Sequence, residues 1–531
     1  MEKRALIAVV LSILFFYGYT ALFPMKKQVP APTVAPAATE AKQASGVTPA
    51  DTPPVPVPAP ATTAAQQKDV TVDTPAYTAV FSTQGGSLKR LVLKSYRESA
   101  DSKGKNVTIV DEQSASTATL ASASQGLGLD QAAVFVPTVD ALSVGKDEKK
   151  ELAFTWTSPA GVTVRKVYAL QGSGYGIEMT YQLANAGAAR VSGALQTVMT
   201  YPAAPRVKES RFETFGPVTF AQDKYVEEKV KDLTPQGKST AAPLWSGFAD
   251  KYFLSAVLAQ NGSIAASSVR STPRGILENV IVSPELSLNP GEAKTVSYRL
   301  YFGPKDLDIL KAQGSSLERA IDLGWFAMLA KPLLQSLKFF YQYTGNYGIA
   351  IIIITVILKV LFYPLTHSSY KSMKEMQKLQ PKMTELREKF KNDRDAMNKA
   401  IMELYQTHKV NPVGGCLPMI VQIPVFFALY KALMFSIELR HAPFMLWIQD
   451  LAGKDPYYVT PIIMGITMVI QQKMTPSQMD PVQQKMMMAL PVVFTFMFLN
   501  FPSGLVLYWL VNNILTITQQ YFINKSIDAK A

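Results

Sequence analysis

Lys359 is the residue whose place in this sequence most directly implies chemistry, because it interrupts the apolar run 347–365. That run is long enough to form a helix in a lipid bilayer, where an ionisable side chain costs about 2.5–3.5 kcal/mol unless it reaches water. Two interpretations remain open. The lysine stem can extend to the lipid headgroups, since Thr366 is only about 10 Å of helix away. Alternatively, the ammonium faces a wet cavity inside the protein.

Polar side chains on other apolar runs favour the cavity. One polar group can be incidental, whereas several on different helices indicate a shared hydrophilic space. The polar residues predicted to line it together with Lys359 are Thr355, Gln422, Asn513 and Thr516.

Composition excludes several kinds of active site. The 531 residues include one cysteine, Cys416, and three histidines, none of them before His367. A disulfide framework, a cysteine-based metal cluster and a histidine-dependent site in the first two thirds are therefore excluded. No nucleotide-binding Gly-x-x-x-x-Gly-Lys-Ser/Thr run occurs, and we predict neither a cofactor nor a metal.

The overall balance of residues suggests a membrane. Apolar residues make up 48% of the chain and charged residues 18%, with a mean hydropathy of +0.09. The net charge of +13 indicates an anionic partner, which is either a membrane surface or a nucleic acid.

The first 68 residues are predicted to be an anchor and a tether. Residues 5–23 carry no charge, which is a longer run than the apolar part of a signal peptide, so we favour a retained transmembrane anchor over residues 1–24. Ten of the 35 prolines fall between residues 24 and 67, and we expect a disordered linker over residues 25–68.

Residues 69–310 alternate between apolar and polar positions, with turn signals such as Gly85-Gly86 between the runs. This pattern predicts an external, all-β antiparallel sandwich. Residues 315–344 then show helical spacing and many aromatic side chains, so we expect an amphipathic helix at the membrane interface. A helix in a soluble core would look similar.

The last 187 residues predict a helical membrane domain over residues 345–524 and a short tail over residues 525–531. Its five apolar segments are 347–365, 417–435, 458–470, 486–501 and 505–522, and three of them are short enough that the bilayer should thin around them. The loop 367–414 carries ten Lys/Arg, against two in the loop 437–457, which places the first loop and both termini in the cytoplasm and the β-domain outside.

Within this cytoplasmic loop, residues 367–412 have the periodicity of a helical hairpin. Nucleic-acid binding is the rival interpretation of its basic surface. Six acidic residues interspersed along it favour a docking surface for proteins, with no nucleic acid as the primary ligand.

Four motifs in the helical part resemble the YidC membrane protein insertases of Gram-negative bacteria. They are Asn411–Pro418, Leu439–Phe444, Asp455–Tyr458 and Phe501–Tyr508. The likeness is dense from residue 347 to residue 520 and extends to the order of anchor, linker and external β-domain.

This resemblance implies a five-helix insertase core with a hydrophilic groove, in which a positive charge attracts acidic or polar substrate segments. Lys359 stands where the family usually has arginine, which keeps the charge but loses the planar fork. Thr355 matches a groove threonine, Trp509 an aromatic residue that contacts substrate, and Tyr508 lies beside it. The external domain is similar to supersandwich folds of sugar mutarotases, but without histidine it is not expected to retain their catalysis.

The predicted function is therefore a non-enzymatic insertase and chaperone of the cell inner membrane. The implied partners are nascent membrane proteins, the Sec translocon, the lipid bilayer, and a ribosome or targeting factors that bind the hairpin. The alternative is a secondary transporter or channel in which Lys359 is an ion or proton site, although the five segments show no inverted repeat. An intramembrane protease would need a serine beside Lys359, and none is present.

Overall fold

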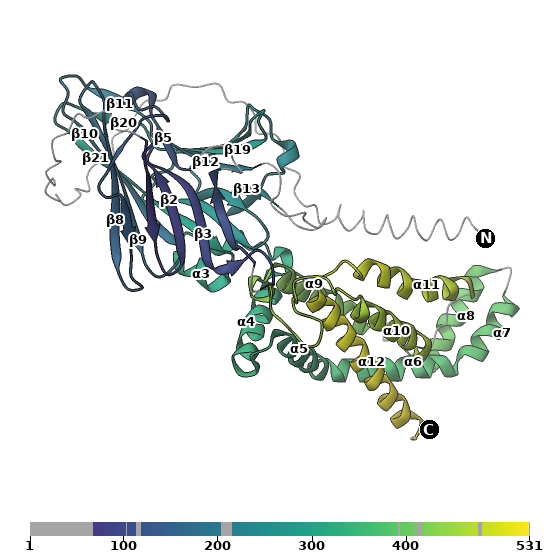
Figure 1. Ribbon diagram of the computed structural model, residues 1–531. Coiled ribbons are helices and arrows are strands. Elements are labelled where there is room, and N and C mark those ends of the chain that lie inside the picture. The colour runs from purple at the N-terminus through teal and green to yellow at the C-terminus, as the bar shows by residue number, and fades with distance from the viewer. Residues whose placement is uncertain are drawn as a thin grey trace. The chain divides into compact units, whose positions relative to one another are not determined.

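The computed structural model describes residues 67–101, 104–112, 118–202, 215–390, 393–408, 410, 417–475 and 481–529. The predicted anchor and all but the last two residues of the predicted linker lie outside these ranges, as does most of the motif 411–418. Within them, a β-rich domain is followed by a helical region (Figure 1). This order is the predicted one, and the predicted fold class is confirmed at that level.

A nine-stranded sheet is the largest element of the β-rich domain. In spatial order its strands are β14 (Lys224–Glu227), β13 (Gly216–Ala221), β16 (Trp245–Ala249), β17 (Phe253–Ala259), β21 (Ala293–Pro304), β10 (Gly176–Asn185), β9 (Val162–Gln171), β8 (Lys149–Thr157) and β6 (Val136–Pro137). Neighbours pair antiparallel throughout. Along β10 buried residues alternate with more exposed ones, which is the predicted period of two.

Three smaller sheets complete the domain. The first is β4 (Asn106–Asp111), β3 (Ser87–Arg97), β2 (Tyr77–Ser82), β1 (Asp69–Asp73) and β7 (Ala141–Ser143); the second is β15 (Lys238–Ala241), β18 (Ala266–Ser271), β19 (Ile276–Val282), β12 (Gln196–Pro202) and β5 (Ala121–Ala123); the third is β11 (Val191–Gly193) with β20 (Leu286–Leu288). The one parallel pair among these strands is β1 with β7.

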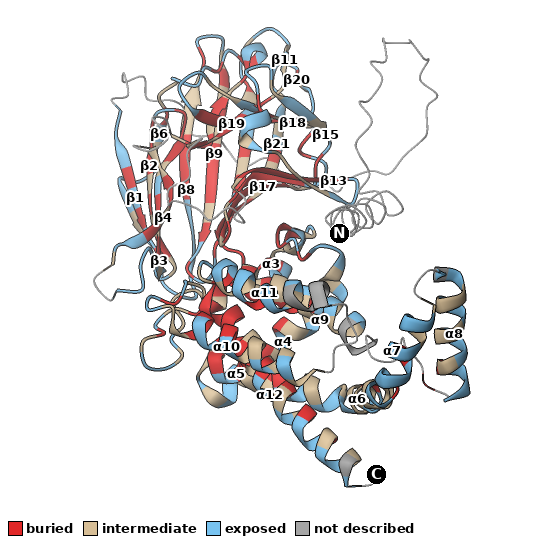
Figure 2. Cartoon of the chain, turned by 90° about the vertical axis from the view of Figure 1, so that its right-hand side faces the viewer, coloured by how far each residue is buried: buried red, intermediate tan, exposed pale blue. Residues whose placement is uncertain are grey.

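Aromatic contacts show how the sheets are layered. The ring of Phe81 on β2 lies 4.7 Å from that of Tyr168 on β9, and Tyr201 on β12 stacks on Phe248 of β16 at 5.4 Å. Both five-stranded sheets therefore pack on the nine-stranded sheet, as a sandwich requires. Figure 2 shows the resulting core in red along strands such as β9 and β17.

Lys166 is fully buried in this core on β9. Its ammonium donates to the Leu120 carbonyl at 2.5 Å and the Ser122 hydroxyl at 2.9 Å, and it lies over the rings of Tyr168 and Tyr181. None of the described carboxylates forms an ion pair with it. Burial lowers the pKa of Lys166 well below its ordinary value of 10.5.

The helical region contains α3 (Leu307–Gln313), α4 (Ala327–Thr344), α5 (Tyr347–Leu361), α6 (Tyr363–Lys378), α7 (Gln380–Lys389), α8 (Arg394–Thr407), α9 (Leu417–Phe435), α10 (Val459–Met474), α11 (Pro481–Phe498) and α12 (Ser503–Asp528). Short 3₁₀ turns cover Gln125–Leu127 and Val230–Asp232 in the β-rich domain. In the helical region they cover Leu317–Ala320, Gly324–Phe326 and Ile437–Leu439. Among the described residues, no individual helix has both the length and the apolarity of a membrane span, while α5 and α6 pass that test as a pair bent by 60°.

Two predicted helices differ from the structure. The amphipathic helix expected over residues 315–344 begins only at Ala327, because 3₁₀ turns and Gly324, with its positive φ, occupy the stretch before it. In α4 itself Leu334 and Leu337 are buried, while Met328 is 84% exposed. The segment 347–365 is likewise divided, since α5 ends at Leu361 and α6 starts with Pro364 in its first turn.

The predicted hairpin consists of α6, α7 and α8. Asp393 caps α8 by accepting hydrogen bonds from Asp395 N and Ala396 N. Met383 of α7 and Tyr405 of α8 are buried together, and the Tyr405 hydroxyl donates to Met383 Sδ at 3.3 Å. The first arm is broken after Lys378 because Pro381 begins a new helix.

The environment of Lys166 makes a pH-dependent prediction. A lysine whose pKa is lower in the folded than in the unfolded chain binds fewer protons when folded, so the free energy of unfolding rises as pH increases toward 10.5. We expect Lys166→Met to remove this dependence. Amide exchange of β9 peptides in the full-length protein, corrected for intrinsic rates, measures it, and equal pH dependence of the two proteins would contradict the prediction.

Candidate functional site

Lys359 lies in the last turn of α5, just before the bend into α6. At the other end of α5, the Asn346 side chain accepts hydrogen bonds from Gly348 N and Ile349 N, so the helix is capped there. A cation in a last turn also interacts favourably with the free carbonyls of the helix end. The Lys359 side chain is partly buried and points to α12.

Thr516 on α12 is the partner of Lys359. The Lys359 ammonium donates to Thr516 Oγ1 at 2.8 Å, and this hydroxyl donates in turn to the Asn512 carbonyl at 2.6 Å. Gln519 adds a second link, because its amide donates to the Lys359 carbonyl at 3.3 Å. The structure thus brings together two predicted site residues. It also adds Gln519, which shares a face of α12 with Thr516.

Other predicted polar residues pair α12 with different helices. The Gln422 amide of α9 donates to the Tyr508 hydroxyl at 3.0 Å, and the Asn513 amide donates to the Thr467 hydroxyl of α10 at 3.3 Å. Near the end of α10, the buried Gln520 donates to the Met474 carbonyl at 2.8 Å. The polar groups of α12 therefore hold α5, α9 and α10 around it. The roles of Thr467 and Gln520 were not predicted.

Thr355 behaves differently from the other predicted groove residues. It is buried, and its hydroxyl donates to the Ile351 carbonyl of its own helix at 2.7 Å. Sequence spacing placed it one turn from Lys359, but its recorded hydrogen bond stays within α5.

Trp509 belongs to an aromatic pocket between α9, α11 and α12. Its ring lies 4.7 Å from that of Phe426 and 5.1 Å from that of Phe498. The pocket has a volume of about 230 Å³ and is lined by Phe426, Phe427, Tyr430, Phe494, Met497, Phe498, Phe501 and Trp509. Such a lining suits apolar groups, in contrast to the polar contacts of Lys359.

The loop between α9 and α10 is bound to the start of α12. Asp450 accepts hydrogen bonds from His441 N and Ala452 N at 2.9 Å each, and its carbonyl accepts one from the Ser503 hydroxyl at 2.7 Å. Ser503 N also donates to the Gly453 carbonyl at 2.6 Å. Residues from two of the four sequence motifs therefore fix where α12 begins.

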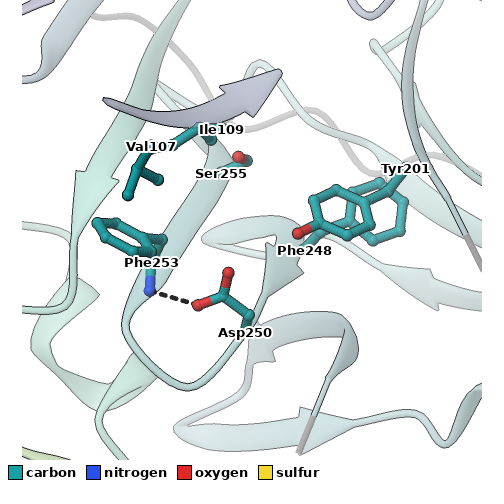
Figure 3. A pocket seen from close by; sticks show the side chains of 7 residues that line it. All are labelled: Val107, Ile109, Tyr201, Phe248, Asp250, Phe253 and Ser255. Atoms are coloured by element: carbon teal, nitrogen blue, oxygen red, sulfur yellow. Dashed lines mark hydrogen bonds between the residues drawn. The ribbon is translucent and has the colours of Figure 1, made fainter. Parts of the chain in front are cut away.

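A separate small cavity lies in the β-rich domain (Figure 3). Its lining includes the stacked Tyr201 and Phe248 and the Asp250 carboxylate, which accepts a hydrogen bond from Phe253 N at 2.7 Å. Its volume of about 10 Å³ is enough for about one water molecule, so this cavity is too small for a sugar ring.

Comparisons with known proteins agree with this architecture. The family described as 60Kd inner membrane protein matches residues 339–530, and the YidC periplasmic domain family matches residues 69–336. A membrane protein insertase YidC of Geobacter metallireducens is 77% identical over 535 residues, covering 100% of this chain and 99% of the relative. Its counterpart in Geobacter sulfurreducens is 74% identical over 528 residues, covering 99% of each chain.

A solved structure, described as an active YidC insertase with the first transmembrane domain resolved, is also similar. It is 18% identical, the match covers 86% of this chain and 92% of that chain, and the TM-score is 0.38.

A match to a periplasmic domain family followed by a match to an inner membrane protein family places the chain among the bacterial inner-membrane proteins that carry a periplasmic domain. More specifically, the chain belongs to the YidC family. The resemblance drawn from the four motifs is thereby confirmed.

Close packing of α10 on α11 leads to a stability prediction. A Cβ at Gly465 would overlap the Thr495 hydroxyl. Gly465→Ala should therefore lower the free energy of unfolding by about 1–3 kcal/mol, although alanine is otherwise the better helix former. Thermal denaturation in detergent measures the change. Adding Thr495→Ala to Gly465→Ala should restore part of the lost free energy of unfolding. A Gly465→Ala protein as stable as the wild type would contradict this interpretation.

Proposed function

We propose that this chain inserts and folds proteins of the inner membrane through a polar groove around Lys359. The observation that carries the proposal is the ammonium of Lys359, which lies on the apolar helix α5 and is held by Thr516 of α12. Membership of the YidC family supports it, since the relatives are named membrane protein insertases. The proposed groove residues are Lys359, Thr355, Gln422, Tyr508, Trp509, Asn513 and Thr516.

In this proposal two parts of the groove bind two parts of the substrate. The Lys359 ammonium attracts an acidic or polar part of the substrate that has to cross the bilayer, because it lowers the cost of removing that group from water. The apolar segment that follows contacts the aromatic pocket at Trp509 before it enters lipid. Burial of apolar surface and the membrane potential supply the free energy, so no nucleotide hydrolysis and no enzymatic step are needed.

We further propose that the hairpin of α6, α7 and α8 is cytoplasmic and binds a ribosome or targeting factors. Its exposed basic side chains are interspersed with acidic ones, which favours a protein partner. Both termini lie in the cytoplasm in this topology, and the β-rich domain lies in the periplasm. The chain then acts alone or together with the Sec translocon.

A secondary transporter or channel remains the second candidate considered. The names of the relatives give it no support. Lys359 also has a hydroxyl partner, whereas a proton relay through the membrane needs further titratable groups along its path.

Charge substitutions at Lys359 test the groove. Lys359→Arg should insert substrates at close to the wild-type rate, because guanidinium has the same charge. Lys359→Ala should slow a substrate with an acidic external segment about threefold to tenfold relative to a matched neutral substrate, and Lys359→Glu should slow it more. The readout is insertion of the substrate pair at equal insertase levels. If Lys359→Ala inserts both equally well, Lys359 takes no part in insertion.

Protease protection tests the proposed topology. Protease added outside spheroplasts should cleave the β-rich domain, residues 70–304, and leave α7 and α8 intact, because the Lys/Arg count places these helices in the cytoplasm. Immunoblotting with tags in each region measures the fragments, and lysed spheroplasts provide the control. Cleavage within α7 or α8 in sealed cells would contradict the topology.

A further inference from the structure

Thr516 makes two hydrogen bonds with different directions. Its hydroxyl proton goes to the Asn512 carbonyl one turn earlier at 2.6 Å. A hydroxyl has one proton, so toward Lys359 it can only accept, and the Lys359 ammonium lies 2.8 Å away. The bond along α12 thus orients the oxygen lone pairs of Thr516 to the cation.

Lys359 needs such an anchor because its charge is at the end of a flexible four-carbon stem. Among the described residues, Thr516 Oγ1 is the one hydrogen-bond acceptor of this ammonium. The bond to Thr516 uses one of the three N–H groups of Lys359. Two N–H groups therefore remain for another acceptor. The backbone of Lys359 is held separately by Gln519, so the threonine contact acts on the side chain alone.

We infer that Thr516 is a positioning residue, which holds the Lys359 ammonium so that its two other N–H groups are directed to an acidic group of the substrate. This inference rests on the proposed function, in which Lys359 receives acidic substrate segments. It adds the residue that makes a mobile point charge directional.

Other threonines in the helical region show that the bond to Lys359 is not a by-product of helix geometry. Thr355, Thr495 and Thr518 each donate to the carbonyl four residues earlier, at 2.7–2.8 Å, as Thr516 does. None of these three has a recorded second hydrogen bond from a described side chain. Thr518 lies on the same helix and is exposed, which makes it a matched control.

The experiment measures insertion of two substrates that differ only in acidic residues of the external segment. Thr516→Val keeps the shape of the side chain but removes the acceptor, so it should slow the acidic substrate about threefold to tenfold and leave the neutral one within about twofold. Thr516→Ser should insert both as the wild type does. Thr518→Val should also resemble the wild type, because it loses the same backbone bond without a contact to Lys359.

The background at position 359 separates positioning from a structural role. In a Lys359→Arg background, Thr516→Val should slow the acidic substrate less than it does with Lys359. The planar guanidinium has five donors in a fixed arrangement and depends less on one anchor. In a Lys359→Ala background, Thr516→Val should add no acid-specific loss. Equal slowing of both substrates by Thr516→Val, or an undiminished effect in Lys359→Ala, would overturn the inference.

Two further outcomes distinguish the inference from the function on which it rests. If Lys359→Ala shows no acid-specific loss, the proposed function fails. If Lys359→Ala shows that loss while Thr516→Val does not, only the inference fails. Should Thr516→Val not accumulate in membranes, Thr516→Ala is measured in its place and has to meet the same expectations.

Discussion

A polar side chain that leaves water needs a partner, and among the described helices α12 supplies such partners to three others. Tyr508, Asn513 and Thr516 follow one another along this helix and bind α9, α10 and α5 respectively. Each contact would be costly to break in an apolar environment, because both groups would lose their hydrogen bond. The arrangement of the helices thus depends on polar contacts as much as on packing, and Lys359 takes its position from the same network.

The β-rich domain meets the same constraint by different means. Its core encloses Lys166 without a described carboxylate partner, and carbonyl and hydroxyl groups from Leu120 and Ser122 receive the ammonium. Since Lys166 is on the nine-stranded sheet and Ser122 on a five-stranded one, the lysine connects two layers of the sandwich. The aromatic contacts of Phe81 and Tyr201 do so by packing. Polar and apolar contacts therefore both define how the sheets align.

Local sequence patterns predicted the helices and strands better than they predicted which of these elements pack or pair with one another. Alternation within residues 69–310 predicted strands, and β10 and β21 are among them. The apolar run 417–435 matches α9 residue for residue. No local signal indicates that β17 pairs with β21, because pairing depends on residues far apart in the chain. The starts of α4 and α6 were missed where 3₁₀ turns and Pro364 outweighed apolar periodicity.

The candidate site shows the same limit. Lys359 stands out in the sequence because it is a charge in an apolar run, and Thr516 because it is polar in another. That the two touch depends on how α5 packs on α12, across 157 residues of chain. Gln519 was not predicted, since a polar residue near the end of the apolar run 505–522 is ordinary in sequence, and only the structure reveals its bond to the Lys359 backbone.

The bend between α5 and α6 has a mechanical consequence. α5 is held at its far end, where Asn346 caps the helix and donates to the Phe444 carbonyl at 2.7 Å. α6 is held on the other side of the bend, where Lys374 donates to the Asn524 carbonyl of α12 at 3.5 Å. The 16 residues of α6 extend about 24 Å, and a tilt of about 10° moves the far end by about 4 Å but its first turn by less than about 1 Å. A tilt of α6 about the bend would therefore shift the Lys359 ammonium, one turn before Phe362, far less than the end of α6.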